Sequence, residues 1–167
     1  MAHPSKLFHR LEPLFAPGER VVPGLALIET VMGKGVVATR LFPAGSVVGR
    51  FWGRVLPWHQ IPYLDRAYVM PAGRDFWTIP EEPERYINHS CEPNLRFGEG
   101  GVLTALRDIA PGEEIYFAYD VLPPGLGDET SGPDSDPSYG RWDHAFTFRC
   151  LCGAPSCRGV IDRNLRG

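Results

Sequence analysis

The stretch RYINHSCEPN, residues 85–94, places an asparagine, a histidine and a cysteine within four positions. Three simple explanations compete for it. Asn88 begins a glycosylation sequon, which has no use in a reducing compartment. His89 beside Cys91 suggests a cysteine nucleophile with its base, although we expect side chains two positions apart to face each other rarely in such a dyad. His89 also fits a plain turn residue, but none of the three explanations accounts for the whole stretch.

The other three cysteines stand in RCLCGAPSCRG, residues 149–159, and with Cys91 they are the four cysteines of the chain. Four cysteines allow one four-thiolate zinc site or two disulfides, and Cys150 and Cys152 are too close to pair with each other. The N-terminal residues lack the pattern of a secretory signal. We therefore expect a cytoplasmic location, or a nuclear one in a eukaryote, where clustered thiols more often bind metal. We expect Cys91, Cys150, Cys152 and Cys157 to be the ligands of one zinc ion. Disulfides or free thiols are the alternatives.

Length and composition favour one mostly β domain. The chain of 167 residues is long enough to form a hydrophobic core that needs no disulfide or metal ion for stability. Its 19 glycines and 17 prolines indicate many turns and short strands. The net charge of −3 and the pI near 5.9 do not indicate a surface that binds nucleic acid. No apolar run approaches the roughly 18 residues of a membrane span.

Short apolar or alternating runs, separated by glycine and proline, predict brief strands within residues 25–121. These runs are LALIETV (25–31), GVVATRLF (35–42), SVVGRFWGRVL (46–56), AYVM (67–70), FWTI (76–79), VLTALRDI (102–109) and EIYFAYDVL (114–122). Residues 1–24 are expected to form a flank with a short amphipathic segment. Residues 122–145, rich in Pro, Gly, Asp and Ser, are expected to be a surface loop or linker. Residues 146–167 then form a separate cysteine segment.

Two further stretches complete the pattern. In MGKGVVA, residues 32–38, a G-x-G is expected on a turn between strands, where glycine lets the backbone approach a ligand. A plain β-turn is the alternative, and no third glycine opens a helix as in a dinucleotide site. In PGEEIYFAYD, residues 111–120, a turn leads into a strand whose alternation puts Ile115, Phe117 and Tyr119 on one face. Taken singly, each aromatic residue fits a core position.

Taken in order, these motifs resemble the SET-domain family of protein-lysine methyltransferases. The order is G-x-G-x-x-A, RFWGRV, RYINHSCEPN, PGEEIYFAY and C-x-C-x4-C, and the last resembles the post-SET zinc segment of that family. The resemblance runs from about Leu25 to Ile161. It implies a SET fold of small β-sheets in which the NHSC stretch and the C-terminal motif cross as a pseudoknot. Without a cysteine-rich pre-SET segment, the chain is similar to a minimal SET plus post-SET protein.

The resemblance implies a protein-lysine N-methyltransferase that uses S-adenosyl-L-methionine as methyl donor and binds zinc. It implies a protein or peptide substrate with a lysine in a basic segment, and no direct binding of nucleic acid or membrane. Tyr119 would be the catalytic residue. The donor-binding residues would be Met32, Gly33, Lys34, Tyr68, Arg85, Asn88, His89 and Leu151. The channel for the substrate lysine would be lined by Phe51, Tyr86, Phe117 and Tyr119.

Three positions depart from the pattern of the family. Arg54 stands where Glu is common, Ala118 where Asp often precedes the catalytic tyrosine, and Tyr86 where Phe is usual. Arg54 bears on the choice of substrate more than on activity. Phe117 favours di- or trimethylation, because a tyrosine there tends to limit the number of methyl groups. The alternatives are an inactive SET-fold binding module, and a methyltransferase that acts on a non-histone protein or a small peptide.

Overall fold

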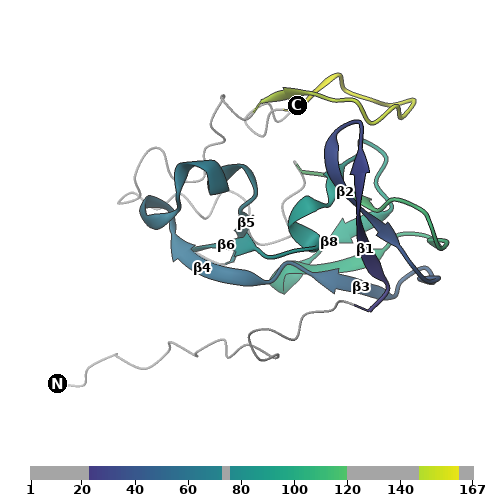
Figure 1. Ribbon diagram of the computed structural model, residues 1–167, viewed down its shortest axis with the longest axis horizontal. Helices are drawn as coiled ribbons and strands as arrows, with labels where there is room; N and C mark the ends of the chain where they lie inside the picture. Colours follow the sequence, from purple (N-terminus) through teal and green to yellow (C-terminus); the bar gives the residue numbers. More distant parts are fainter. Residues whose placement is uncertain (1–22, 73–75, 120–146, 162–167) are drawn as a thin grey trace.

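The computed structural model describes residues 23–72, 76–119 and 147–161, whose strands form five small sheets (Figure 1). The expected mostly β class is confirmed. The expected N-terminal flank and the 122–145 linker lie outside the described residues, apart from Pro23 and Gly24. The strands are β1 (Leu25–Thr30), β2 (Gly33–Ala38), β3 (Val47–Arg50), β4 (Gly53–Pro57), β5 (Met70–Pro71), β6 (Phe76–Pro80), β7 (Asn88–His89), β8 (Leu95–Phe97), β9 (Val102–Ala105), β10 (Tyr116–Phe117), β11 (Phe148–Arg149) and β12 (Val160–Ile161).

The helices of the described residues are short 3-10 turns that connect the strands. They are η1 (Trp58–Gln60), η2 (Tyr63–Ala67), η3 (Glu84–Tyr86) and η4 (Glu99–Gly101). Within the described part of the chain, none is long and apolar enough to cross a membrane.

A tight hairpin joins β1 and β2. Thr30 lies opposite Gly33, so Val31 and Met32 alone form the turn. The Thr30 hydroxyl closes it, because Oγ1 accepts from the Met32 N–H at 3.0 Å and donates to the Gly33 carbonyl at 2.9 Å. The prediction that the G-x-G forms the turn is therefore wrong in detail: both glycines lie on β2, directly after it.

The run 46–56 does not form the single strand that its composition predicts. It is divided into β3, which pairs with β9, and β4, which pairs with β6 in a different sheet. At the break, Phe51 donates its backbone N–H to the Gly101 carbonyl at 2.9 Å. A Cβ on Gly53 would lie 1.9 Å from the Ile79 carbonyl oxygen, so only glycine allows the two backbones to approach in this way. The sharp change of direction is a tertiary effect that strand propensity does not report.

The parallel pair of β7 and β10 brings together the two most informative motifs. Asn88 lies opposite Tyr116, and His89 opposite Phe117. The Ser90 N–H continues the ladder to the Phe117 carbonyl at 3.3 Å. The NHSC stretch thus lies beside the PGEEIYF stretch, as the resemblance implies, although no strand was predicted at residues 88–89.

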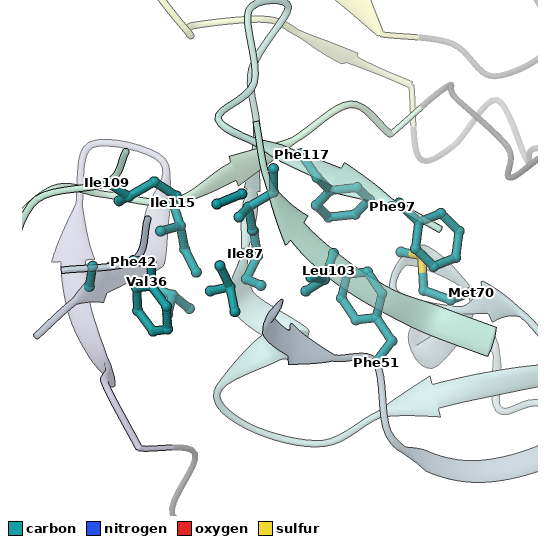
Figure 2. Close-up of a cluster of buried hydrophobic side chains, with 14 residues drawn as sticks. Val36, Phe42, Phe51, Met70, Ile87, Phe97, Leu103, Ile109, Ile115 and Phe117 are labelled. Atoms are coloured by element: carbon teal, nitrogen blue, oxygen red, sulfur yellow. The ribbon is translucent and has the colours of Figure 1, made fainter. Parts of the chain in front are cut away.

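Fourteen buried residues form the main core. Figure 2 shows Phe51, Phe97 and Phe117 gathered at one end of this core, near Met70. Its members are Val36, Ala38, Phe42, Val48, Phe51, Met70, Ile87, Leu95, Phe97, Leu103, Ala105, Ile109, Ile115 and Phe117. Of the face predicted to carry Ile115, Phe117 and Tyr119, the first two residues are buried in the core and Tyr119 is partly buried against it. A smaller cluster of Ile61, Val69, Trp77 and Ile79 stabilises the sheet of β4, β6 and β5.

Leu103→Ala should lower the free energy of unfolding by about 2–5 kcal/mol, because the Leu103 side chain is fully buried and its loss leaves a cavity. Leu106→Ala, the same change three residues later at a side chain 43% exposed, should cost less than about 1 kcal/mol. Urea unfolding followed by tryptophan fluorescence measures both. Equal losses in the two variants would contradict the described core.

Candidate active site and metal centre

The four cysteines, although separated by up to 66 positions in the sequence, meet in one cluster. All four Sγ atoms of Cys91, Cys150, Cys152 and Cys157 lie within 4.8 Å of one another, and those of Cys91 and Cys150 are 3.9 Å apart. Tetrahedral zinc with Zn–S bonds of about 2.3 Å places its sulfurs about 3.8 Å apart. A disulfide needs sulfurs at about 2.05 Å, and all four thiols are free. The geometry fits a zinc site, and no disulfide joins any of the four cysteines, which are all described.

The electrostatics of the cluster also fit a cation. Burial raises the pKa of the Cys150 thiol to about 12, so its thiolate needs a positive partner. Burial also opposes ionisation of Cys152, but hydrogen bonds from the backbone at Cys91 and Ala154 and from neighbouring thiols lower the pKa of Cys152 to about 6. The Arg158 backbone N–H points at Cys91 Sγ at 3.4 Å. Backbone donors of this kind stabilise thiolates, which are the form that binds metal.

A carboxylate ties the cysteine segment to the domain beside the cluster. Glu92 Oε1 accepts from the Ser156 hydroxyl at 2.8 Å and from the Ser156 N–H at 3.2 Å. In Figure 1 the segment, drawn in yellow, lies at one edge of the domain, with β11 and β12 paired antiparallel. Sequence reasoning missed this role of Glu92, which the position of Glu92 next to the metal ligand Cys91 could have suggested.

On the side expected to bind the methyl donor, Asn88 is held by two partners. Its Nδ2 donates to the Lys34 carbonyl at 3.0 Å and to Glu114 Oε1 at 3.1 Å. A Cβ on Gly35 would lie 2.6 Å from that carboxylate oxygen, so the second glycine of G-x-G is needed for this close approach. Tyr116 donates its hydroxyl to Glu114 Oε2 at 2.7 Å, and burial together with this carboxylate raises the pKa of Tyr116. Glu114 therefore orients the site, a role that the sequence analysis missed because PGEE was interpreted as a turn.

Four of the expected donor-site and channel residues meet next to Asn88. Arg85 forms an ion pair with Asp65 at 2.5 Å and lies over the ring of Tyr68 at 4.3 Å. The rings of Tyr68 and Tyr86 are 6.3 Å apart, and Lys34 Nζ lies 4.6 Å from the centre of the Tyr86 ring. Tyr86 joins this group through its ring contacts, and it also packs against the main core, which contains Phe51 and Phe117.

The three other residues expected to line the lysine channel form a continuous row of ring contacts, named here the aromatic stack, in which neighbouring rings meet edge-on or tilted. Phe51 and Phe117 are buried with ring centres 5.0 Å apart, and Phe117 and Tyr119 are 4.8 Å apart. The Tyr119 hydroxyl donates to the Ile87 carbonyl at 2.9 Å. Phe148, from the cysteine segment, lies 6.1 Å from Tyr119. Sequence reasoning missed Phe148, whose contact depends on how the cysteine segment folds back.

The expectation that His89 and Cys91 do not face each other is wrong. His89 Nε2 lies 3.3 Å from Cys91 Sγ. Side chains at i and i+2 of an extended chain lie on the same face, and the hydrogen bond from the Ser90 N–H to the Phe117 carbonyl continues the pairing one residue beyond β7. His89 Nδ1 accepts from the Tyr119 N–H at 3.1 Å. These contacts engage the ring of His89, a residue that is 3% exposed, and its contact with a donor stays a prediction.

The remaining residues expected to bind the donor lie at the surface. Met32, in the turn of the β1–β2 hairpin, is half-buried, and Gly33, the first residue of β2, is exposed. Leu151, between two of the clustered cysteines, is 56% exposed. Their contacts with a donor stay predictions.

The SET-domain family model matches residues 33–120. Histone-lysine N-methyltransferase Set2 of Drosophila melanogaster is 29% identical over 148 residues, which are 77% of this chain and 6% of that protein. The H3 lysine-9 specific histone-lysine N-methyltransferase KMT1 of Fusarium mangiferae is 38% identical over 90 residues, 47% of this chain and 23% of that protein. The chain thus spans less than a third of the length of these curated relatives.

Solved structures agree with the fold. KRYPTONITE in complex with mCHH DNA, an H3(1-15) peptide and SAH has a TM-score of 0.55 and 26% identity, over 81% of this chain and 29% of that chain. KRYPTONITE with mCHG DNA and SAH has a TM-score of 0.56 and 24% identity, over 81% of this chain and 28% of that one.

Elemental analysis should find about one zinc per chain. Cys91→Ser should lower the zinc content and release the cysteine segment to proteolysis, because three thiolates bind the ion more weakly than four. Ser46→Ala, which removes a hydroxyl that bonds to the Pro43 carbonyl in the turn before β3, should keep the full zinc content. A Cys91→Ser protein with one tightly held zinc would contradict the assignment.

Proposed function

Because the chain belongs to the SET-domain family, we propose that it is a protein-lysine N-methyltransferase that uses S-adenosylmethionine. The observation that carries the proposal is the match over residues 33–120, more than half of the 167 residues. This range contains the described Asn88 site, the aromatic stack and Tyr119. The SAH in the KRYPTONITE structures supports the choice of donor, and the H3(1-15) peptide in one of them supports a protein substrate.

The residues expected to hold the donor have a suitable arrangement. The bond from Asn88 to the Lys34 carbonyl fixes the strand edge that follows the hairpin turn. Arg85 and Tyr68 offer a stacked cation and ring nearby. When bound, S-adenosylmethionine supplies an electrophilic methyl group, whose bond to sulfur breaks with its electron pair going to sulfur as the lysine nitrogen forms the new C–N bond. The protein must align that nitrogen and keep it unprotonated.

The aromatic stack offers surroundings that favour an unprotonated lysine nitrogen, which is the second requirement. A lysine ammonium has no lone pair, so it must lose a proton before it can accept a methyl group. Phe51 and Phe117 form apolar walls, and removal from water lowers the pKa of a lysine. The same rings, with Tyr119, can hold a methylated ammonium by cation–π contact.

Tyr119 combines a fixed hydroxyl with a position at the end of the stack. Its O–H donates to the Ile87 carbonyl at 2.9 Å. A phenol oxygen that donates its proton retains lone pairs, which can accept from the substrate amine or make weak C–H···O contacts with a polarised methyl group. We assign to Tyr119 the alignment of the amine, and to the zinc cluster the attachment of Phe148 and Leu151 beside the site.

The substrate is a lysine in a basic protein segment, and the histone substrates in the names of the relatives favour a histone tail. They also favour a nuclear over a cytoplasmic location. We further propose di- or trimethylation, because Phe117 adds no hydroxyl that could retain water against the amine. The donor-binding and channel residues named from the sequence remain part of this proposal.

Tyr119→Phe should lower the rate of methylation about 100-fold or more, because the alignment of the amine is lost. Transfer of labelled methyl groups from the donor to core histones measures it. Tyr63→Phe, which removes the same hydroxyl from a half-exposed ring on η2, should leave the rate unchanged. S-adenosylhomocysteine should bind both variants, as calorimetry can test.

A Tyr119→Phe protein as fast as the wild type would contradict the catalytic assignment. A wild-type protein that neither binds nor labels would indicate an inactive binding module.

Phe117→Tyr should shift the products toward monomethyl-lysine, because the new hydroxyl can hold a water where further methyl groups would lie. Mass spectrometry of a methylated histone peptide reports the distribution. An unchanged distribution in this variant would contradict the proposed role of Phe117.

A further inference from the structure

We infer that His89 couples the zinc cluster to the main chain of the catalytic tyrosine, so that zinc occupancy and the position of Tyr119 depend on each other. His89 acts here as a positioning residue. Its proposed importance for turnover rests on the proposed function, whereas the coupling itself can be tested without turnover.

The hydrogen bonds fix the tautomer of the His89 ring. The Tyr119 backbone N–H can only donate, so the Nδ1 that it reaches at 3.1 Å must be an acceptor. The proton of a neutral ring is then on Nε2, which faces Cys91 Sγ at 3.3 Å. A zinc-bound thiolate is an acceptor, and the Nε2–H is the matching donor. One ring therefore connects a metal ligand to the residue proposed to be catalytic.

The ring has little room to move between these two partners. It is buried, with 3% of the residue exposed, and its edge lies against Tyr119 at 5.3 Å between ring centres. The His89 main chain is fixed in β7 opposite Phe117. The Tyr119 hydroxyl is fixed at the other end by the Ile87 carbonyl. A displacement of Cys91 is therefore transmitted to the backbone of Tyr119, because no part of the path can absorb it by rotation into solvent.

The expected size of the effect follows from similar contacts. Loss of a residue that hydrogen-bonds to a metal ligand usually weakens metal binding about 10–100-fold. Because coupling between two equilibria is reciprocal, removal of zinc should in turn weaken the bond from Tyr119 to His89.

Two conservative substitutions separate the two hydrogen bonds of His89. In His89→Asn, the amide oxygen falls near the position of Nδ1, so the acceptor for the Tyr119 N–H is kept and the donor to Cys91 is lost. In His89→Gln, the amide nitrogen falls near the position of Nε2, so the donor to Cys91 is kept and the acceptor for Tyr119 is lost. His59→Asn, at an exposed position on η1, is the control.

Zinc affinity, measured by competition with a chromophoric chelator, should fall about tenfold in His89→Asn and stay near the wild-type value in His89→Gln and His59→Asn. Hydrogen exchange of the Tyr119 amide, followed by NMR with the Leu103 amide as internal reference, should be about fivefold faster in His89→Gln than in His89→Asn. Chelation of zinc should accelerate this exchange in the wild type and in His59→Asn, and should have little effect in either His89 variant.

Wild-type zinc affinity in His89→Asn would overturn the inference, as would equal acceleration by chelation in the wild type and in the His89 variants. The wild-type comparison with and without zinc needs no variant, so Tyr119 exchange that is unaffected by zinc overturns it even where a variant fails to fold. Neither readout uses the methyl donor. Failure of the coupling therefore leaves the proposed methyltransferase activity standing, and absence of that activity leaves the coupling test valid.

Discussion

The parallel pairing of β7 with β10 is the interaction on which the rest of the structure depends. It has only two residue pairs, and so short a ladder is weak by itself. Buried neighbours stabilise it: Asn94, which is 2% exposed, accepts from the Tyr116 N–H at 2.8 Å and donates to the Glu114 carbonyl at 2.9 Å. Ile87, directly before β7, and Phe117, on β10, are both buried in the main core. Since β10 leads directly into Tyr119, the core determines where the aromatic stack ends.

The thiol cluster imposes a second constraint, because the cysteine segment has little core of its own. Of its residues between 147 and 161, Cys150 and Ile161 are buried, whereas most of the others are exposed. A segment of this kind cannot offset its ordering entropy by apolar burial. Metal binding can supply the missing free energy, as in other small zinc-stabilised elements. The hydrogen bond from Ser156 to Glu92 also orients the cysteine segment relative to Cys91.

The sequence predicts the parts of this arrangement that follow from the number of cysteines and from the alternation of side chains along a strand. The motif C-x-C-x4-C with Cys91 as the remaining cysteine predicts one metal site, and the alternation after PGEE predicts that Ile115, Phe117 and Tyr119 lie on one face. The sequence does not predict β7, because a two-residue strand has no periodicity and its partner is distant. Nor does it predict the role of Glu114, since a carboxylate in a turn is usually solvated. Most of the missed contacts join residues distant in sequence, such as Glu92 with Ser156 and Tyr119 with Phe148.

The NHSC stretch acquires its two roles from the geometry of an extended chain. Successive side chains alternate between faces, so Asn88 points toward Lys34 and Glu114 while His89 and Cys91 share the opposite face. The contacts of Asn88 and the thiol cluster therefore lie on two faces of one short stretch, residues 88–91. Insertion of a single residue would exchange the faces, and would separate Asn88 from Lys34 or Cys91 from the thiol cluster. The spacing within the motif is thus fixed by the pleat of the strand, not only by the chemistry of each side chain.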